Sequence, residues 1–199
     1  YTDLDASLLQ QYQNDPDVKD LITQYETLGT QFVNLNLSDA ALQDARVRQA
    51  LSLAINRQEL IDSIVGGAGI ACSGWLAPQT PGFDKSAAAF EYDPEKAKSL
   101  QLDDPGMYVG FAVWEEFDQF RGMALSAKVR NGISQKQLVA IQGYWNEIGV
   151  TLDVQVEDNG VWAQDWADGS LQVTALGWFP LYADADNHMY TYFYSENAA

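Results

Sequence analysis

An amphipathic helix over residues 47–55 constrains the fold more than any other segment of this sequence. Its apolar side chains recur at i, i+3, i+4, i+7 and i+8, a spacing that places them along one helix face. These residues are Val47, Ala50, Leu51, Ala54 and Ile55. Polar side chains occupy the positions between them, Arg48 among them. The segment therefore predicts a helix that covers a hydrophobic core with its apolar stripe.

Strands and helices alternate along the rest of the chain. Further helices are predicted at residues 4–13, 60–65, 95–100, 134–148, 161–167 and 186–195. Strands are predicted at residues 21–26, 31–37, 107–114, 151–156 and 171–176. The pattern does not assign residues 115–132, and residues 66–92 read as a loop. Alternation of this kind is typical of an α/β domain, and because no Pro- or Ser-rich linker interrupts it, residues 1–199 are expected to form one domain.

Composition excludes several classes of protein. The chain has 199 residues, with 47% hydrophobic and 12% aromatic residues, which is too apolar for a disordered chain. Its 11 basic and 28 acidic residues give a net charge of −17, which disfavours binding to nucleic acids and to anionic membranes. The first residues lack the basic and apolar regions of a signal peptide, so we expect a cytosolic chain, a mature secreted form or an excised piece.

Residues that carry catalytic chemistry are scarce. His188 is the sole histidine, and no Gly-x-Ser-x-Gly motif accompanies it. Cys72 is the sole cysteine, which excludes an internal disulfide and a cysteine-based zinc site, and it has no activating partner nearby in the sequence. The stretch 184–187 hints at a calcium loop, but Met189 stands where that motif requires glycine. We therefore expect no enzyme activity, no cofactor and no metal.

Aromatic residues crowd the last 40 positions, and core packing is the expected role for most of them. Trp178 differs because it follows the apolar stretch 173–176 and precedes the Phe179–Pro180 pair. The carboxyl end of a strand is where α/β sheets present groups to ligands, and a Trp there can supply a flat wall. Two hypotheses therefore remain for Trp178, ligand contact and core packing.

Several segments, in this order, resemble the family 5 extracellular solute-binding proteins, the peptide, dipeptide and nickel receptors of ABC importers. Residues 44–57 are similar to the family's "D-x-R-V-R-x-A-l-x-x-A-I-D-R" helix, and residues 177–187 to its "G-W-x-x-D-Y-p-D-a-d-n" segment. Weaker likenesses occur at residues 29–36, 66–83, 92–98 and 142–150. Together they extend over roughly residues 20–195.

The resemblance implies one lobe of a type II periplasmic-binding-protein fold, with a mixed sheet flanked by helices. Family members have two lobes that close on a ligand, and this chain matches the carboxyl-proximal lobe, so its companion lobe is expected to be absent. The implied function is to bind oligopeptides or similar small solutes and deliver them to an ABC permease. The implied location is extracytoplasmic, in the periplasm or at the cell surface, with any lipid anchor outside this chain.

The resemblance also implies ligand-binding residues. The backbone of Gly177, Trp178 and Phe179 would pair with an extended peptide, and Trp178 and Trp162 would line the cleft. In peptide-binding members, an Asp three residues after the Trp receives the amino terminus of the peptide. Leu181 occupies that position here, so Asp184 or Asp186 would have to substitute. Half a cleft is expected to bind peptides weakly or not at all.

Two other functions remain open at this point. The chain would be an interaction or sensor module if a larger regulatory protein contained it. A hydrolase that uses its acidic residues is the more distant alternative, and it would require a spaced carboxylate pair in a closed pocket.

Overall fold

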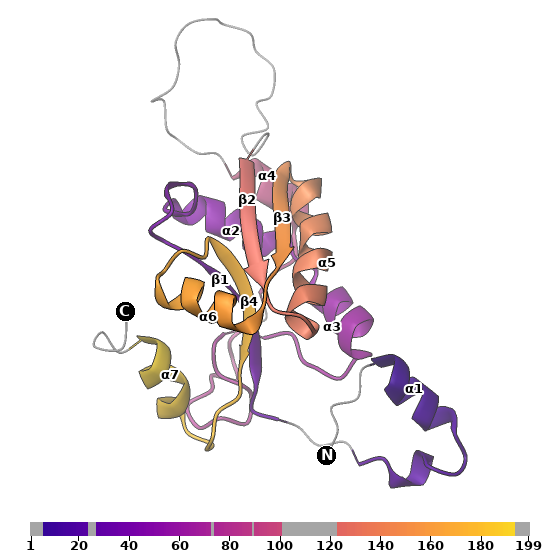
Figure 1. The fold of residues 1–199 in the computed structure, drawn as a ribbon. Coiled ribbons are helices and arrows are strands. Elements are labelled where there is room, and N and C mark those ends of the chain that lie inside the picture. Colours follow the sequence, from indigo (N-terminus) through magenta and orange to yellow (C-terminus); the bar gives the residue numbers. More distant parts are fainter. Residues whose placement is uncertain (1–5, 24–26, 73, 89, 101–122, 194–199) are drawn as a thin grey trace, which may run out of the picture. The chain divides into compact units, whose positions relative to one another are not determined.

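The computed structural model describes residues 6–23, 27–72, 74–88, 90–100 and 123–193 (Figure 1). The helices are α1 (Ala6–Asn14), α2 (Ala45–Leu53), α3 (Arg57–Val65), α4 (Pro94–Ser99), α5 (Ile133–Glu147), α6 (Asn159–Ala167) and α7 (Ala185–Phe193), with short 3-10 helices η1 (Lys19–Leu21) and η2 (Ala40–Leu42). The strands are β1 (Thr30–Leu35), β2 (Met123–Val129), β3 (Val150–Val156) and β4 (Val173–Trp178). None of the helices described here is long and apolar enough to cross a membrane.

The four strands form one mixed sheet in the order β1-β4-β2-β3. β2 runs parallel to β3 along its whole length and parallel to β4 at Ala127 and Val173. Just beyond the end of β1, the N–H of Asn36 donates to the C=O of Gln172, which precedes β4, at 2.9 Å. Because the end of one strand meets the start of the other, β1 is antiparallel to β4. The sheet and its helices confirm the predicted α/β fold with a mixed sheet.

The five apolar residues predicted for the stripe are all 8% exposed or less, which confirms their burial. Helix α2 ends earlier than predicted, at Leu53, with Ala54 as its C-cap and Ile55 beyond it. Asp44 begins the helix, and its carboxylate accepts the N–H of Arg46 at 2.8 Å and pairs with the guanidinium of Arg46 at 2.7 Å. These hydrogen bonds, chiefly the one from the Arg46 side chain, lower the pKa of Asp44 to about 2. An N-cap Asp of this kind satisfies helix N–H groups that have no partner within the helix.

The contacts between residues divide the chain into two compact units. Unit 1 comprises Tyr1–Phe32, Arg57–Phe90 and Ala175–Ala199, and unit 2 comprises Val33–Asn56 and Glu91–Thr174. Strands β1 and β4 each contribute residues to both units. The expectation that residues 1–199 form a single lobe stays a prediction.

Unit 2 contains the larger described core. Helix α5 packs on β3 and β2, and α2 packs on α4. The indole of Trp145, in α5, is 1% exposed and donates its N–H to the C=O of Leu51, in α2, at 3.0 Å. Leu138 and Ile141 are buried on the same face of α5, and the helix ends before Gly149, which has a φ of 85°. The helix predicted over residues 134–148 is thus confirmed, with each end shifted by one residue.

Unit 1 contains α3, whose apolar residues are buried only in part. The residues predicted to face inward, Leu60, Ile61, Ile64 and Val65, are all half-buried. The predicted stop is confirmed, because Gly66 and Gly67 adopt φ values of 62° and 81° that disfavour other residues.

The structure corrects the prediction of a strand over residues 21–26. Leu21 ends the 3-10 helix η1, where its N–H donates to the C=O of Val18 at 2.9 Å, and no strand includes Ile22 or Thr23. Leu21 is exposed, so no sheet partner covers its apolar side chain. Residues 24–26 and the predicted strand over residues 107–114 lie outside the described residues. Strand β2 lies in the stretch that the sequence pattern did not assign.

Candidate functional site

Five of the six predicted ligand residues lie on one segment of unit 1, residues 177–190, which we call the post-strand segment. It begins with the last two residues of β4, Gly177 and Trp178, and continues through a loop into α7. A Cβ atom on Gly177 would meet the side-chain amide of Gln31, so glycine leaves room for that amide beside the strand. The carboxyl end of β4 therefore carries the residues that the sequence placed there.

Trp178 is half-buried and fixed by a hydrogen bond. Its indole N–H donates to the backbone C=O of Asn187, in the first turn of α7, at 3.1 Å. The ring is therefore held by its polar edge, while the residue as a whole stays partly accessible. A buried indole N–H costs free energy unless it has an acceptor. This bond supplies the acceptor, so the ring can lie partly within the protein.

Asn187 also holds the loop that follows Trp178. It is 8% exposed, and its side-chain oxygen accepts the backbone N–H of Leu181 at 3.3 Å. One residue thus contacts the tryptophan ring through its backbone and the loop through its side chain. The sequence motif included Asn187, but nothing in its pattern indicated these two contacts.

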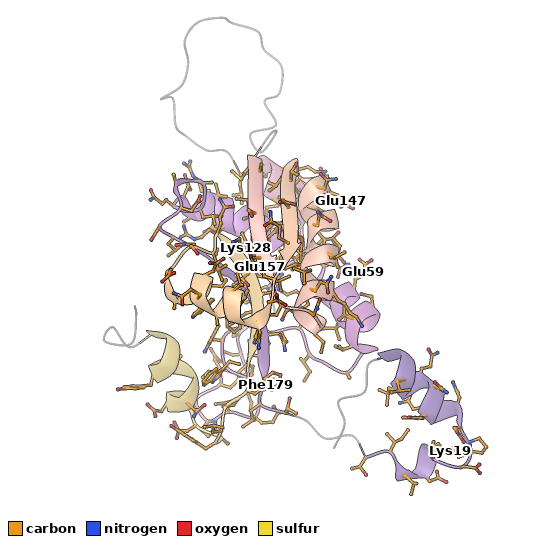
Figure 2. All side chains as sticks on the ribbon, in the orientation of Figure 1. Lys19, Glu59, Lys128, Glu147, Glu157 and Phe179 are labelled. Atoms are coloured by element: carbon orange, nitrogen blue, oxygen red, sulfur yellow. The ribbon has the colours of Figure 1, made fainter. Side chains whose placement is uncertain are left out.

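Large apolar and aromatic side chains project from the post-strand segment. Leu181 is 91% exposed and Phe179 is 59% exposed, and Figure 2 labels Phe179 on the chain that leaves β4. Tyr182, Met189 and Tyr190 are exposed as well. The Phe179 ring lies over Gly29, where a Cβ atom would collide with it. Gly29 is a second residue of this region that the sequence did not indicate.

The two candidate acids, Asp184 and Asp186, are exposed and bonded within the loop. The carboxylate of Asp184 accepts the N–H of Asp186 at 2.9 Å, and the carboxylate of Asp186 accepts the hydroxyl of Tyr182 at 3.1 Å. Each carboxylate retains acceptor capacity beyond these bonds, so each can still receive a cationic group. No group of three or more His, Cys, Asp or Glu residues suited to a metal ion occurs among the described residues.

Trp162, the sixth predicted residue, lies in α6 in unit 2 and is 7% exposed. Its indole N–H donates to the hydroxyl of Thr174 at 3.0 Å. Its ring stacks on Trp166 with centroids 5.5 Å apart, and the guanidinium carbon of Arg130 lies 4.4 Å from its centroid. These contacts cover most of the ring with protein.

An ion-pair network connects α6, the helix that contains Trp162, to the sheet. The ammonium of Lys128, at the end of β2, lies 2.6 Å from the carboxylate of Asp165 and 3.0 Å from that of Glu157. Figure 2 labels Lys128 and Glu157. The hydrogen bond that Lys128 donates to Asp165 lowers the pKa of Asp165, and the bonds that it donates to Asp165 and Glu157 raise the pKa of Lys128 itself. The network is an electrostatic contact between α6 and the sheet.

Two hollows among the described residues include none of the predicted ligand residues. One, of about 580 Å³, lies in unit 1 and is lined by Leu9, Gln10, Gln13, Asp62, Ser63, Gly66 and Gly67. The other, of about 500 Å³, lies in unit 2 and is lined by Arg130, Asn131, Ser134, Glu157, Asp158 and Asn159. The exposed side chains of the post-strand segment suit one wall of a binding site.

Comparison with known proteins identifies relatives of the whole chain. The family model described as bacterial extracellular solute-binding proteins, family 5 middle, matches residues 1–199. The dipeptide-binding protein of Escherichia coli K12 is 28% identical over 166 residues, which are 83% of this chain and 30% of that protein. The chain thus spans about a third of the length of the curated relatives that it matches.

Solved structures share the fold. The murein tripeptide binding protein MppA of Escherichia coli superposes with a TM-score of 0.77 and 20% identity, over 97% of this chain and 36% of that chain. The periplasmic binding protein DppA of Helicobacter pylori, in complex with the peptide STSA, gives a TM-score of 0.76 and 22% identity, over 94% of this chain and 33% of that chain. The expected periplasmic-binding-protein fold is thereby confirmed.

Proposed function

Because the chain belongs to the bacterial extracellular solute-binding proteins of family 5, we propose that it is a ligand-binding lobe of a receptor that delivers peptides or similar small solutes to an ABC permease. The dipeptide-binding relative and the peptide-bound structural neighbour support this ligand class. The receptor would work outside the cytoplasm, and its companion lobe would be contributed by sequence beyond this chain.

The observation that carries the proposal is the surface at the end of β4. Trp178 is half-buried and fixed there, and Phe179 and Leu181 stand exposed beside it. A fixed aromatic ring costs little entropy when a ligand packs against it, which favours recognition of apolar groups. The neighbouring backbone can add hydrogen bonds to an extended peptide.

The proposed mechanism is binding without chemistry. A peptide would lie along the post-strand segment and contact Trp178, Phe179 and Leu181 with its side chains. A companion lobe would close over the ligand, exclude water from it and create the closed form that the permease recognises. The two lobes would share the contacts, so neither would hold the ligand well alone.

The charge of the segment suggests which end of a peptide it meets. Leu181 cannot neutralise an ammonium group, whereas Asp184 and Asp186 lie close by in the sequence and are exposed. A free amino terminus would therefore bind near the carboxylates of these two residues, and Leu181 would offer it no charged partner.

The test uses a matched pair of variants in the full-length gene product. Phe179→Ala should weaken the binding of a mixed pool of di- and tripeptides about tenfold in calorimetry, because it removes a large apolar contact. Phe90→Ala is the control, since Phe90 is 52% exposed, also lies in unit 1 and is outside the segment.

Three results would contradict the proposal. They are no heat from the unmutated protein with any peptide, an equal loss of affinity in both variants, and micromolar binding by residues 1–199 alone. The last would show that this lobe needs no companion.

A further inference from the structure

Asn187 is a buried polar residue of the post-strand segment, and its side chain bonds to the backbone of that segment. It is 8% exposed, and its side-chain oxygen lies 3.3 Å from the N–H of Leu181. The donor and the acceptor are six positions apart in the chain, so the bond closes the loop between β4 and α7 upon itself. A buried amide costs stability unless it forms such bonds, so this contact accounts for an Asn at this position.

The backbone of the same residue holds the other end of the loop. The C=O of Asn187 accepts the indole N–H of Trp178 at 3.1 Å. The ring and the backbone three residues after it are therefore positioned against one residue. Asn187, in the first turn of α7, accepts both hydrogen bonds, and together they restrict the orientation of the ring and the path of the loop.

We propose that Asn187 is the positioning residue of the post-strand segment. It holds Leu181 and Trp178 in the arrangement that a ligand meets, so that binding does not have to order the loop. This inference rests on the proposed function, because it assigns Asn187 a role in the same site. Asn187 itself acts through these two residues and need not touch the ligand.

Asn187→Ala isolates the role of the side chain. The backbone C=O remains, so the bond to Trp178 persists, while the N–H of Leu181 loses its acceptor. We expect peptide affinity of the full-length protein to fall roughly fivefold, as expected for the loss of one hydrogen bond that orders the loop. Asn187→Asp keeps an acceptor oxygen in place and should restore most of the affinity.

Asn36→Ala is the matched control in unit 2. The side chain of Asn36 also accepts a backbone N–H, that of Ser38 at 3.0 Å, and it donates to the C=O of Gly169 at 2.8 Å. This variant should lower the unfolding midpoint at least as much as Asn187→Ala and leave peptide affinity unchanged. Unchanged affinity in Asn187→Ala, or an equal loss in Asn36→Ala, would overturn the proposal.

Hydrogen exchange tests the positioning role without any ligand. The amide of Leu181 should exchange about fivefold faster in Asn187→Ala and at nearly the original rate in Asn187→Asp. If the unmutated protein binds no peptide, the proposed function fails, and this readout still decides the role of Asn187. An exchange rate at Leu181 that the substitution leaves unchanged would overturn it.

Discussion

Trp162 and Trp178 were predicted to serve one site, yet the structure gives them opposite surroundings. Trp162 has its indole N–H bonded to a side-chain hydroxyl and its ring covered by Trp166 and Arg130, with 7% of the residue exposed. Trp178 has its indole N–H bonded to a backbone C=O and is only half-buried, and Phe179 and Leu181, which follow it in the chain, are exposed.

This difference teaches that a satisfied indole N–H does not distinguish a core tryptophan from a binding one. What distinguishes them here is how much of the residue is exposed, because Trp162 is buried and Trp178 is only half-buried. A ring covered by protein contributes mainly to stability, whereas an accessible and fixed ring can contribute to binding. A ligand role for Trp162 stays a prediction, and the experiments below separate the two roles.

Trp162→Ala should have the largest effect, on stability. Removing a buried tryptophan leaves a cavity and an unpartnered hydroxyl at Thr174, so we expect a loss of about 3–5 kcal/mol in the free energy of unfolding. Urea unfolding followed by circular dichroism measures it. A loss below about 1 kcal/mol together with a large loss of peptide affinity would instead make Trp162 a ligand residue.

Trp178→Ala should act mainly on binding. We expect at least a tenfold loss of peptide affinity and a smaller loss of stability than in Trp162→Ala, because part of the ring is already accessible. Trp178→Phe, which keeps an aromatic ring without the indole N–H, should recover part of the affinity. Unchanged affinity in Trp178→Ala would remove the contrast between the two residues.

Leu181→Asp should make the site near Trp178 prefer peptides with a free amino terminus. A carboxylate at this exposed position offers a partner to an ammonium group, so a dipeptide with a free amino terminus should bind about tenfold more tightly. The N-acetylated dipeptide should gain nothing, and Leu181→Asn, which has the same shape without the charge, is the control. Equal gains for both peptides would show that the introduced carboxylate does not contact the amino terminus.

Acid should lower the free energy of unfolding by protonating Asp165, which lies in α6 together with Trp162. This effect should be the smallest of the four. The pKa of Asp165 is lowered from 3.8 by its hydrogen bond with Lys128, so the unfolded chain binds this proton more tightly. The contribution is present above pH 3.8 and is lost as the pH falls through the lowered value. Urea unfolding at pH 7, 4 and 3 should therefore show a shallower acid dependence in Asp165→Asn. An identical dependence in both proteins would exclude this contribution.

Sequence periodicity predicted the elements whose apolar residues face one core. The apolar stripe beginning at Val47 and the helices predicted over residues 134–148 and 95–100 follow from local spacing and capping chemistry, and the structure confirms them as α2, α5 and α4. The strand predicted over residues 21–26 failed at Leu21 because apolar residues alone do not supply a sheet partner. Strand β2 (Met123–Val129) was not assigned because it is short and includes two alanines, Ala124 and Ala127, which are depleted in strands.

The sequence by itself determined the α/β pattern, the family and the position of Trp178 at the end of a strand. These depend on the order of residues and on interactions between near neighbours along the chain. Tertiary structure alone decided that β1 pairs antiparallel with β4, that Gly29 underlies Phe179 and that Asn187 holds the loop. The physical reason is that exposure and hydrogen-bond partnership depend on which distant segments meet, and periodicity within one segment carries no record of that.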